Sequence, residues 1–229
     1  MPTASARLRQ KTDLILPAFA KPGRLLLEHP RVRDLYPRYL TASSYASLAM
    51  VPLMEAALQR ARLLAPSDPI AGPLADYLER HIPEEIHGEE PGRAALEDLE
   101  AVGVDTVALR GGRVPEKLAA LIGAQYFWIL YCHPVSILGF LELEAYHPDR
   151  RYIEQLIERT GLPREGFRYL LLHAEVDIEH TEELHRVLDS LPLEPFHEEL
   201  IALSALQTMA LLIDAWLDIV ADGASAVGA

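Results

Sequence analysis

The stretch HAEVDIEHTEEL, from His173 to Leu184, decides the fold class. Its apolar residues recur at helical spacing, which predicts an amphipathic α-helix. His173, Asp177 and His180 occupy positions i, i+4 and i+7, so at about 100° per residue their side chains lie within roughly 40° of one another. Two imidazoles and one carboxylate on one stripe are ligand types that suit a divalent transition metal. The stretch therefore predicts a metal-binding helix.

The competing interpretation of this helix is a solvated acidic face. Four glutamates are close to the stripe, namely Glu175, Glu179, Glu182 and Glu183. Most of them project away from it at helical spacing, which favours an inward-facing metal stripe.

A second cluster of ligand-type residues is HIPEEIH, which contains His81, Glu84, Glu85 and His87. Glu84 and His87 are three residues apart, a spacing at which helix neighbours can hold one metal ion. His81 lies three residues before Glu84, so any two or three of these side chains can converge. The alternative is an exposed capping segment around Pro83.

A third candidate ligand lies in FLELEAYHP, where Glu142 and Glu144 end an otherwise apolar run that begins at Ala119. Charged residues seldom lie on a strongly apolar helix unless they are paired or bound to metal. Only one of the two can face the core, because two residues correspond to about 200° around a helix. Glu55 is a weaker case of the same kind. In a helical bundle, carboxylates and imidazoles from several helices build dinuclear iron or manganese sites.

Helical periodicity dominates the rest of the chain, and strand and hairpin signals are nearly absent. Helices are expected at 33–65, 74–89, 93–103, 115–146 with a kink near His133-Pro134, 149–160, from Pro163 onward, and 195–221. Residues 1–30 are expected to form short helical pieces broken at Pro17, Pro22 and Pro30. Residues 104–115 are expected to form a loop, and about 222–229 a disordered tail. The prediction is an all-α fold, a single helical bundle of about seven helices in one domain, 1–229.

Composition narrows the function classes. The 229 residues carry a formal net charge of −13, and no basic stripe alternates with aromatics, so neither nucleic acid nor an anionic membrane is an expected partner. Cys132 is the only cysteine, so nothing points to an oxidising compartment. No secretory signal or run of about 18 apolar residues is expected. The expected location is the cytoplasm.

The sequence resembles the heme-oxygenase-like diiron oxidases and oxygenases, often described as iron-containing redox enzymes. The resemblance covers roughly residues 35–192. HAEVDIEH fits the His-x3-Asp-x2-His signature of the family, and HPVSILGFLELEA is similar to its HP…LG…LEG segment. HIPEEIH followed by ALEDLEAVG is similar to its ligand-bearing helix and the DL…LG run after it.

The resemblance implies a set of metal ligands: Glu84, His87, Glu144, His173, Asp177 and His180. Glu144 is preferred to Glu142 because Ala145 follows it, where the family usually has Gly. The carboxylate partner of His87 varies among relatives. Two turns upstream lies Arg80, which cannot ligate, so Glu84 is chosen, with Glu79, Glu85 or a direct role for His81 as alternatives.

The resemblance also implies an activity. Family members activate O2 at two irons, so the cofactors expected here are two Fe ions, with manganese as an alternative, and O2 as co-substrate. The expected substrate is a small metabolite, foremost an amino acid or amino-acid derivative, undergoing N-oxygenation, oxidative C–C cleavage or nitrile formation. An external electron donor fits the same picture, and the long apolar helices make a homodimer an expected assembly. Tyr169, Tyr131 and Glu175 are candidates to hydrogen-bond the ligating imidazoles.

Two other classes stay open. The same fold resemblance extends to thiaminase-II-like and pyrroloquinoline-quinone-synthase-like enzymes, which work without metal. The other class is a non-catalytic metal-binding helical bundle. Heme oxygenase itself is less expected, because His29 lies between prolines and no other axial histidine is evident in the first helix.

Overall fold

The computed structural model describes residues 2–86, 93–111, 114–146 and 148–225, with side chains at all of these except 108, 110, 111, 144, 145, 173, 175–179 and 223–225. The described residues form α-helices and no strand, which confirms the all-α prediction. The α-helices are α1 (Ala4–Glu28), α2 (Val32–Leu64), α3 (Ala71–Ile86), α4 (Arg93–Ala101), α5 (Thr106–Gly111), α6 (Glu116–Phe127), α7 (Ile137–Leu141), α8 (Arg150–Thr160), α9 (Arg168–Ser190) and α10 (Pro195–Ser225). Short 3₁₀ or π segments are η1 (Trp128–Cys132), η2 (Pro134–Ser136), η3 (Glu142–Tyr146) and η4 (Arg164–Phe167).

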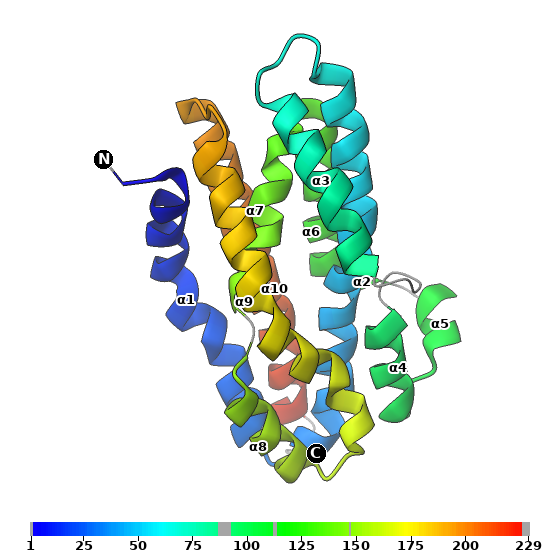
Figure 1. Ribbon diagram of the computed structural model, residues 1–229. Coiled ribbons are helices and arrows are strands. Elements are labelled where there is room, and N and C mark those ends of the chain that lie inside the picture. The colour runs from blue at the N-terminus through cyan, green and yellow to red at the C-terminus, as the bar shows by residue number, and fades with distance from the viewer. Residues whose placement is uncertain (1, 87–92, 112–113, 147, 226–229) are drawn as a thin grey trace.

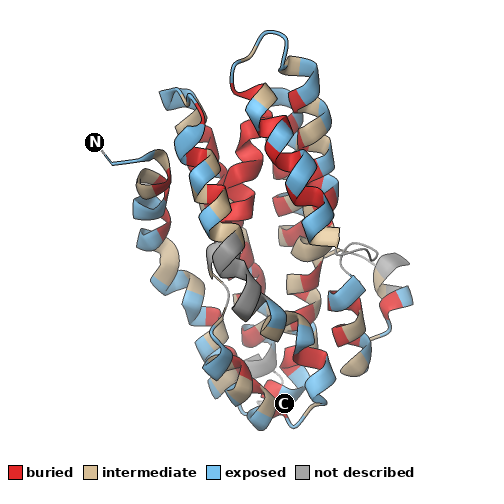
Figure 2. Ribbon diagram, in the orientation of Figure 1, coloured by how far each residue is buried: buried red, intermediate tan, exposed pale blue. Residues whose placement is uncertain are grey.

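The long helices run side by side as a bundle (Figure 1). α10 lies inside it and packs against α1, α2, α6 and α7, while α2 packs along α3. α4 lies beside α2, and α5 lies beside α4; α4 also contacts η4 and the beginning of α9. Buried residues line the faces that the helices turn toward one another (Figure 2). α9 and α3 are thus outer elements whose inner faces meet the same interior.

The first helix differs from the prediction. α1 runs unbroken from Ala4 to Glu28 with Pro17 and Pro22 inside it, where the sequence predicted separate pieces. A proline inside a helix removes one backbone hydrogen bond and costs about 3 kcal/mol. Leu8, Leu26 and Pro22 itself are buried, and α1 packs along α10. This packing offsets the cost of the prolines.

The chain between Glu116 and Tyr146 is divided at His133, as the predicted kink requires. His133 has extended backbone, with φ −154° and ψ 137°, and its Nδ1 accepts the N–H of Val135 at 3.1 Å. Its Nε2 lies 2.8 Å from Asp68 Oδ2, in the connection between α2 and α3. Burial lowers the pKa of His133, although the hydrogen bond to Asp68 opposes this. The imidazole therefore ends one helical segment and begins the next.

Two more predictions need correction. The segment 104–115, expected to be a loop, contains α5, and Asp105 Oδ1 accepts the N–H of Val107 in its first turn at 3.0 Å. Asp caps of this kind support even a short helix. α10 continues to Ser225, so 222–225 belong to a helix and not to a tail, and 226–229 lie outside the described residues. With α5 and α7 as separate elements, the described residues contain ten α-helices against about seven predicted.

α10 also corrects the expectation about apolar runs. Within the described residues, the segment Pro195–Asp222 is long and apolar enough to cross a membrane by length and composition, with mean hydropathy 1.8. In the protein 61% of that window is buried, which is typical of a core helix as well.

The packing of α7 on α10 is very close. A Cβ atom at Gly139 would lie 2.0 Å from the carbonyl oxygen of Ile201 and 2.8 Å from Cβ of Ser204. Gln125 of α6 adds buried polar contacts to α10, since its Nε2 donates to Thr208 Oγ1 at 2.8 Å and its Oε1 accepts from Ser204 Oγ at 2.9 Å. Satisfied buried polar groups fix the register of apolar helices.

Candidate metal centre

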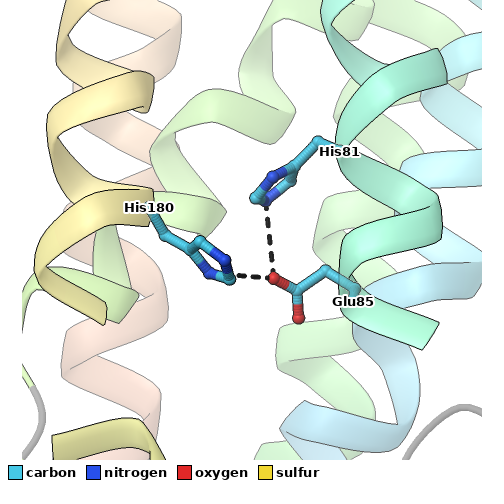
Figure 3. Close-up of side chains that lie close together, drawn as sticks. All are labelled: His81, Glu85 and His180. Atoms are coloured by element: carbon cyan, nitrogen blue, oxygen red, sulfur yellow. Dashed lines mark ion pairs between the residues drawn. The ribbon is translucent and has the colours of Figure 1, made fainter. Parts of the chain in front are cut away.

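Two histidines and a glutamate converge between α3 and α9. His81 and Glu85 are on α3, one helical turn apart, and His180 faces them from α9 (Figure 3). His180 Nδ1 lies 3.2 Å from Glu85 Oε1, and His81 Nε2 lies 3.6 Å from the same oxygen. One donor atom from each residue falls within 4.8 Å of the other two. We call these three residues the His–Glu–His cluster.

The cluster is sheltered from water. The side chains of His81, Glu85 and His180 are 1%, 9% and 14% exposed. Within the described part of the chain, neither ring nitrogen of His81 makes a hydrogen bond. A buried polar group without a hydrogen bond costs about 1–3 kcal/mol. The imidazole instead stacks on Tyr77 at 5.1 Å and contacts the His180 ring edge-on at 5.2 Å.

A second group of donors shares His81. It consists of His81, Glu84 and Glu183, again with one donor atom each within 4.8 Å of one another. His81 Nδ1 lies 3.4 Å from Glu84 Oε2, and the Glu84 side chain is 51% exposed. Carboxylates therefore approach the His81 ring from both nitrogen atoms, and one side of the cluster opens toward solvent.

These donors fit a divalent metal ion. Nitrogen and carboxylate oxygen ligands bind such ions at roughly 2.0–2.2 Å, which places neighbouring donors roughly 3–4 Å apart. The distances of 3.2 and 3.6 Å in the His–Glu–His cluster lie in that range. A mixed nitrogen and oxygen set without thiolate suits iron or manganese. A buried His81 without hydrogen bonds gains a partner if a metal ion is bound.

Of the predicted ligands, the structure brings His180 and Glu84 close to one another. His81 and Glu85, which were alternatives in the sequence-based prediction, lie with them. His87 lies outside the described residues. Glu144 lies on η3, and His173 and Asp177 lie on α9, but the structure does not describe their side chains. The ligand set as a whole stays a prediction.

Two alternative ligands lie elsewhere. Glu79 accepts two hydrogen bonds from Arg62 of α2 and is half-exposed, so it belongs to the outer face of α3. Glu142 is 1% exposed, and its Oε2 lies 3.0 Å from His185 Nε2 of α9. Its Oε1 accepts from Tyr146 at 3.4 Å. Of the pair Glu142 and Glu144, it is Glu142 that is shown to be buried, and it pairs with His185.

Sequence reasoning missed His185 and Asp98. Asp98 of α4 is 1% exposed and accepts the N–H of Tyr169, in the first turn of α9, at 2.8 Å. Burial raises the pKa of Asp98 to about 7, although the Tyr169 N–H and Arg168 oppose the shift. Two signals were available: Asp98 shares an apolar helical face with Ala95 and Leu99, and it is the Asp of ALEDLEAVG, the segment similar to the DL…LG run of the family.

The predicted partners of the imidazoles have mixed outcomes. The hydroxyl of Tyr169 lies 2.9 Å from Ser47 Oγ on α2. Tyr131 is 76% exposed and stacks on Phe127, so its proposed contact with a ligand was wrong. The side chain of Glu175 is outside the description.

Residues 38–212 match the protein family described as iron-containing redox enzymes. The chain belongs to this family. The match covers most of the sequence, including α3, α9 and the His–Glu–His cluster. No curated protein is significantly similar to the chain.

Solved structures share the fold. A domain of unknown function with a heme oxygenase-like fold from Shewanella denitrificans has a TM-score of 0.75 at 16% identity, covering 93% of this chain and 90% of that one. Heme oxygenase-1 from the cyanobacterium Synechocystis, in complex with heme, has a TM-score of 0.72 at 13% identity, covering 99% and 96%. A TenA homologue from Pseudomonas syringae has a TM-score of 0.63 at 16% identity, covering 94% and 93%. These likenesses confirm the heme-oxygenase-like fold of the chain.

Proposed function

We propose that this family member is a non-heme diiron oxidase or oxygenase that uses O2 to oxidise a small metabolite, foremost an amino acid or amino-acid derivative. The observation that carries the proposal is the His–Glu–His cluster between α3 and α9, with a buried His81, in a chain of an iron-containing redox family. N-oxygenation, oxidative C–C cleavage and nitrile formation are the reaction types under consideration.

The residues of the chain have separate tasks in this proposal. His81 and His180 supply neutral nitrogen donors, and Glu85 supplies a negative oxygen that lies close to both. Glu84 and Glu183 would extend the donor set with two carboxylates beside the His81 ring. Along α9, His173 and Asp177 would continue it, as the spacing predicts. Iron, when bound, supplies electrons to O2.

The protein environment limits side reactions. The low exposure of His81 keeps bulk water from the inner donors, and low water content strengthens charge interactions inside the site. The exposed side chain of Glu84 marks the side from which metal ions and small molecules can approach. The formal net charge of −13 favours the approach of cations and disfavours nucleic acid as a partner in this proposal.

The remaining expectations belong to the same proposal. They are manganese as the alternative metal, an external electron donor, a homodimer, a single domain and a cytoplasmic location. The likeness to the TenA homologue supports a second candidate, a metal-independent enzyme of the thiaminase-II-like class. The two candidates differ in whether the His–Glu–His cluster must hold metal.

The test is iron-dependent O2 consumption. The chain, loaded anaerobically with Fe(II), is mixed with oxygenated buffer and a panel of free amino acids and medium-chain fatty acids. We expect substrate-dependent O2 uptake that metal-free protein lacks. Substitution Glu85→Gln should reduce the uptake roughly tenfold or more, because an amide is a poor replacement for a ligating carboxylate.

The matched control is Glu79→Gln. It makes the same chemical change on the same helix, but at a side chain that pairs with Arg62 on the outer face. Its uptake should equal that of the unaltered protein. Equal activity of metal-free and iron-loaded protein would overturn the proposal and favour the metal-independent class.

A further inference from the structure

The N-terminus of α9 is capped from another helix. The N-cap residue Phe167 provides no side-chain hydrogen bond. The first amides of a helix need partners outside the helix. Asp98 of α4 supplies one, since its Oδ2 accepts the N–H of Tyr169 at 2.8 Å across 71 positions of sequence. The helix that carries His180 is therefore held at its start by a side chain of α4.

This contact is built into a tight junction. A Cβ atom at Gly166, directly before Phe167, would lie 2.2 Å from Val102 Cγ1 and 3.2 Å from the carbonyl oxygen of Asp98. Phe167 is fully buried and stacks on Tyr36 of α2, with ring centroids 4.4 Å apart. The hydroxyl of Tyr36 donates to the Gly166 carbonyl at 2.9 Å. The chain entering α9 is thus fixed against both α2 and α4.

The acid at this junction is expensive to keep. Asp98 is 1% exposed, and burying a carboxylate disfavours its charged form. A Ser, Thr or Asn at the N-cap position would satisfy a first-turn amide without that cost. Unlike an N-cap residue within α9 itself, the acceptor on α4 couples the start of α9 to a second helix.

We propose that Asp98 is a positioning residue for the metal centre. Through the amide of Tyr169 it sets the axial position of α9, and so the level at which His180 meets Glu85 and His81 of α3. Tyr169 and His180 are separated by 11 residues, or about 16 Å of continuous helix, so an axial shift at Tyr169 also moves His180. Donor positions in metal sites must be held to within about 0.5 Å. The proposal rests on the proposed function in that the cluster must bind metal.

The test compares Asp98→Ala and Asp98→Asn with the control Glu97→Gln. Glu97 is the adjacent acid on α4, and it pairs with Arg93 at the surface. Hydrogen exchange of peptides spanning α9 reports on the junction, and Co(II) or Fe(II) titration reports on the centre. We expect Asp98→Ala to speed exchange from Tyr169 through His180 and to weaken metal affinity by about 10–100-fold. Asp98→Asn should restore both, because its amide oxygen can accept the same N–H.

Three results would overturn the inference. One is exchange and affinity in Asp98→Ala equal to those of Glu97→Gln. Another is faster exchange with unchanged affinity, which leaves a structural cap only. The third is measured in the metal-free protein. There the NMR chemical shift of the His180 ring should change in Asp98→Ala but not in Glu97→Gln, and an unchanged shift in Asp98→Ala would contradict a positioning role.

Two further controls separate the possible failures. If the unaltered protein binds no metal, the proposed function fails, and the exchange and the His180 ring shift still decide the role of Asp98. If Asp98→Ala does not fold, Asp98→Glu replaces it. That variant keeps the charge and moves the acceptor by one methylene, and we expect the same loss of affinity; unchanged affinity would overturn the inference.

Discussion

Asp98 gives the folded protein a specific pH dependence. Its pKa is about 7 in the folded protein and 3.8 for the unperturbed group, chiefly because burial disfavours the carboxylate. Between these values the folded protein holds a proton that the unfolded chain has lost. The contribution of Asp98 to the free energy of unfolding is therefore largest below about pH 4 and declines as the pH rises to about 7.

We predict that Asp98→Asn removes this dependence. At about 1.4 kcal/mol per pKa unit, the variant should gain stability relative to the unaltered protein, on the order of 3 kcal/mol between pH 4 and 7. Urea unfolding at several pH values measures the difference directly. Parallel stability curves for the two proteins across this range would show that folding does not raise the pKa of Asp98.

At single residues, the sequence identified part of the site. The stripe on α9 and the cluster HIPEEIH were recognisable because ligand types recur at helical spacing, and His180, Glu84, Glu85 and His81 do lie together. Asp98 and His185 were missed because their partners, Tyr169 and Glu142, are on other helices. Such contacts depend on how helices pack, which spacing along one helix does not reveal.

At the scale of elements, α7 and α10 pack too closely for any side chain at Gly139. We predict that Gly139→Ala destabilises the protein by about 1–3 kcal/mol or more, because the added methyl group meets the backbone of Ile201 and must push the two helices apart. Thermal or urea unfolding measures the loss.

Gly123 of α6 provides the matched control. Among the described residues, apart from its chain neighbours and the nearby backbone of α6, no atom lies within 4 Å of a Cβ at this position. Gly123→Ala should therefore stabilise the protein by about 0.4–1 kcal/mol, because alanine restricts the unfolded chain. Equal changes in stability for Gly139→Ala and Gly123→Ala would contradict the close packing of α7 on α10.

Element boundaries were predicted unevenly, for a physical reason. The segments with strong periodicity, such as α2 and α8, lie close to their predicted ranges. The prediction for α1 was wrong because local rules make Pro17 and Pro22 helix breakers, whereas contacts with α10 keep the helix intact. The loop predicted where α5 lies was wrong because the glycines, which favour a loop, were given more weight than a short apolar run capped by Asp105.

At the scale of the whole molecule, the bundle brings α3 and α9, far apart in sequence, to a common interior (Figures 1 and 3). The all-α class followed from periodicity, and the heme-oxygenase-like fold from family motifs, and both are confirmed. The long apolar helix α10 was expected, but its spanning length was not recognised. Apolar length alone does not distinguish a core helix from a membrane helix; burial by neighbouring helices does.

The central claim is that this interior holds iron. The most direct measurement is the number of iron ions bound per chain, determined by elemental analysis after anaerobic loading with Fe(II) and removal of unbound metal. It compares the unaltered protein with His81→Ala, His180→Ala and the control His197→Ala. His197 lies at the start of α10 against His133, outside the His–Glu–His cluster. We predict about two iron ions in the unaltered protein and in His197→Ala, and fewer than half as many in the cluster variants, with helix content preserved. Absence of bound iron in the unaltered protein, or full occupancy in both cluster variants, would contradict the claim.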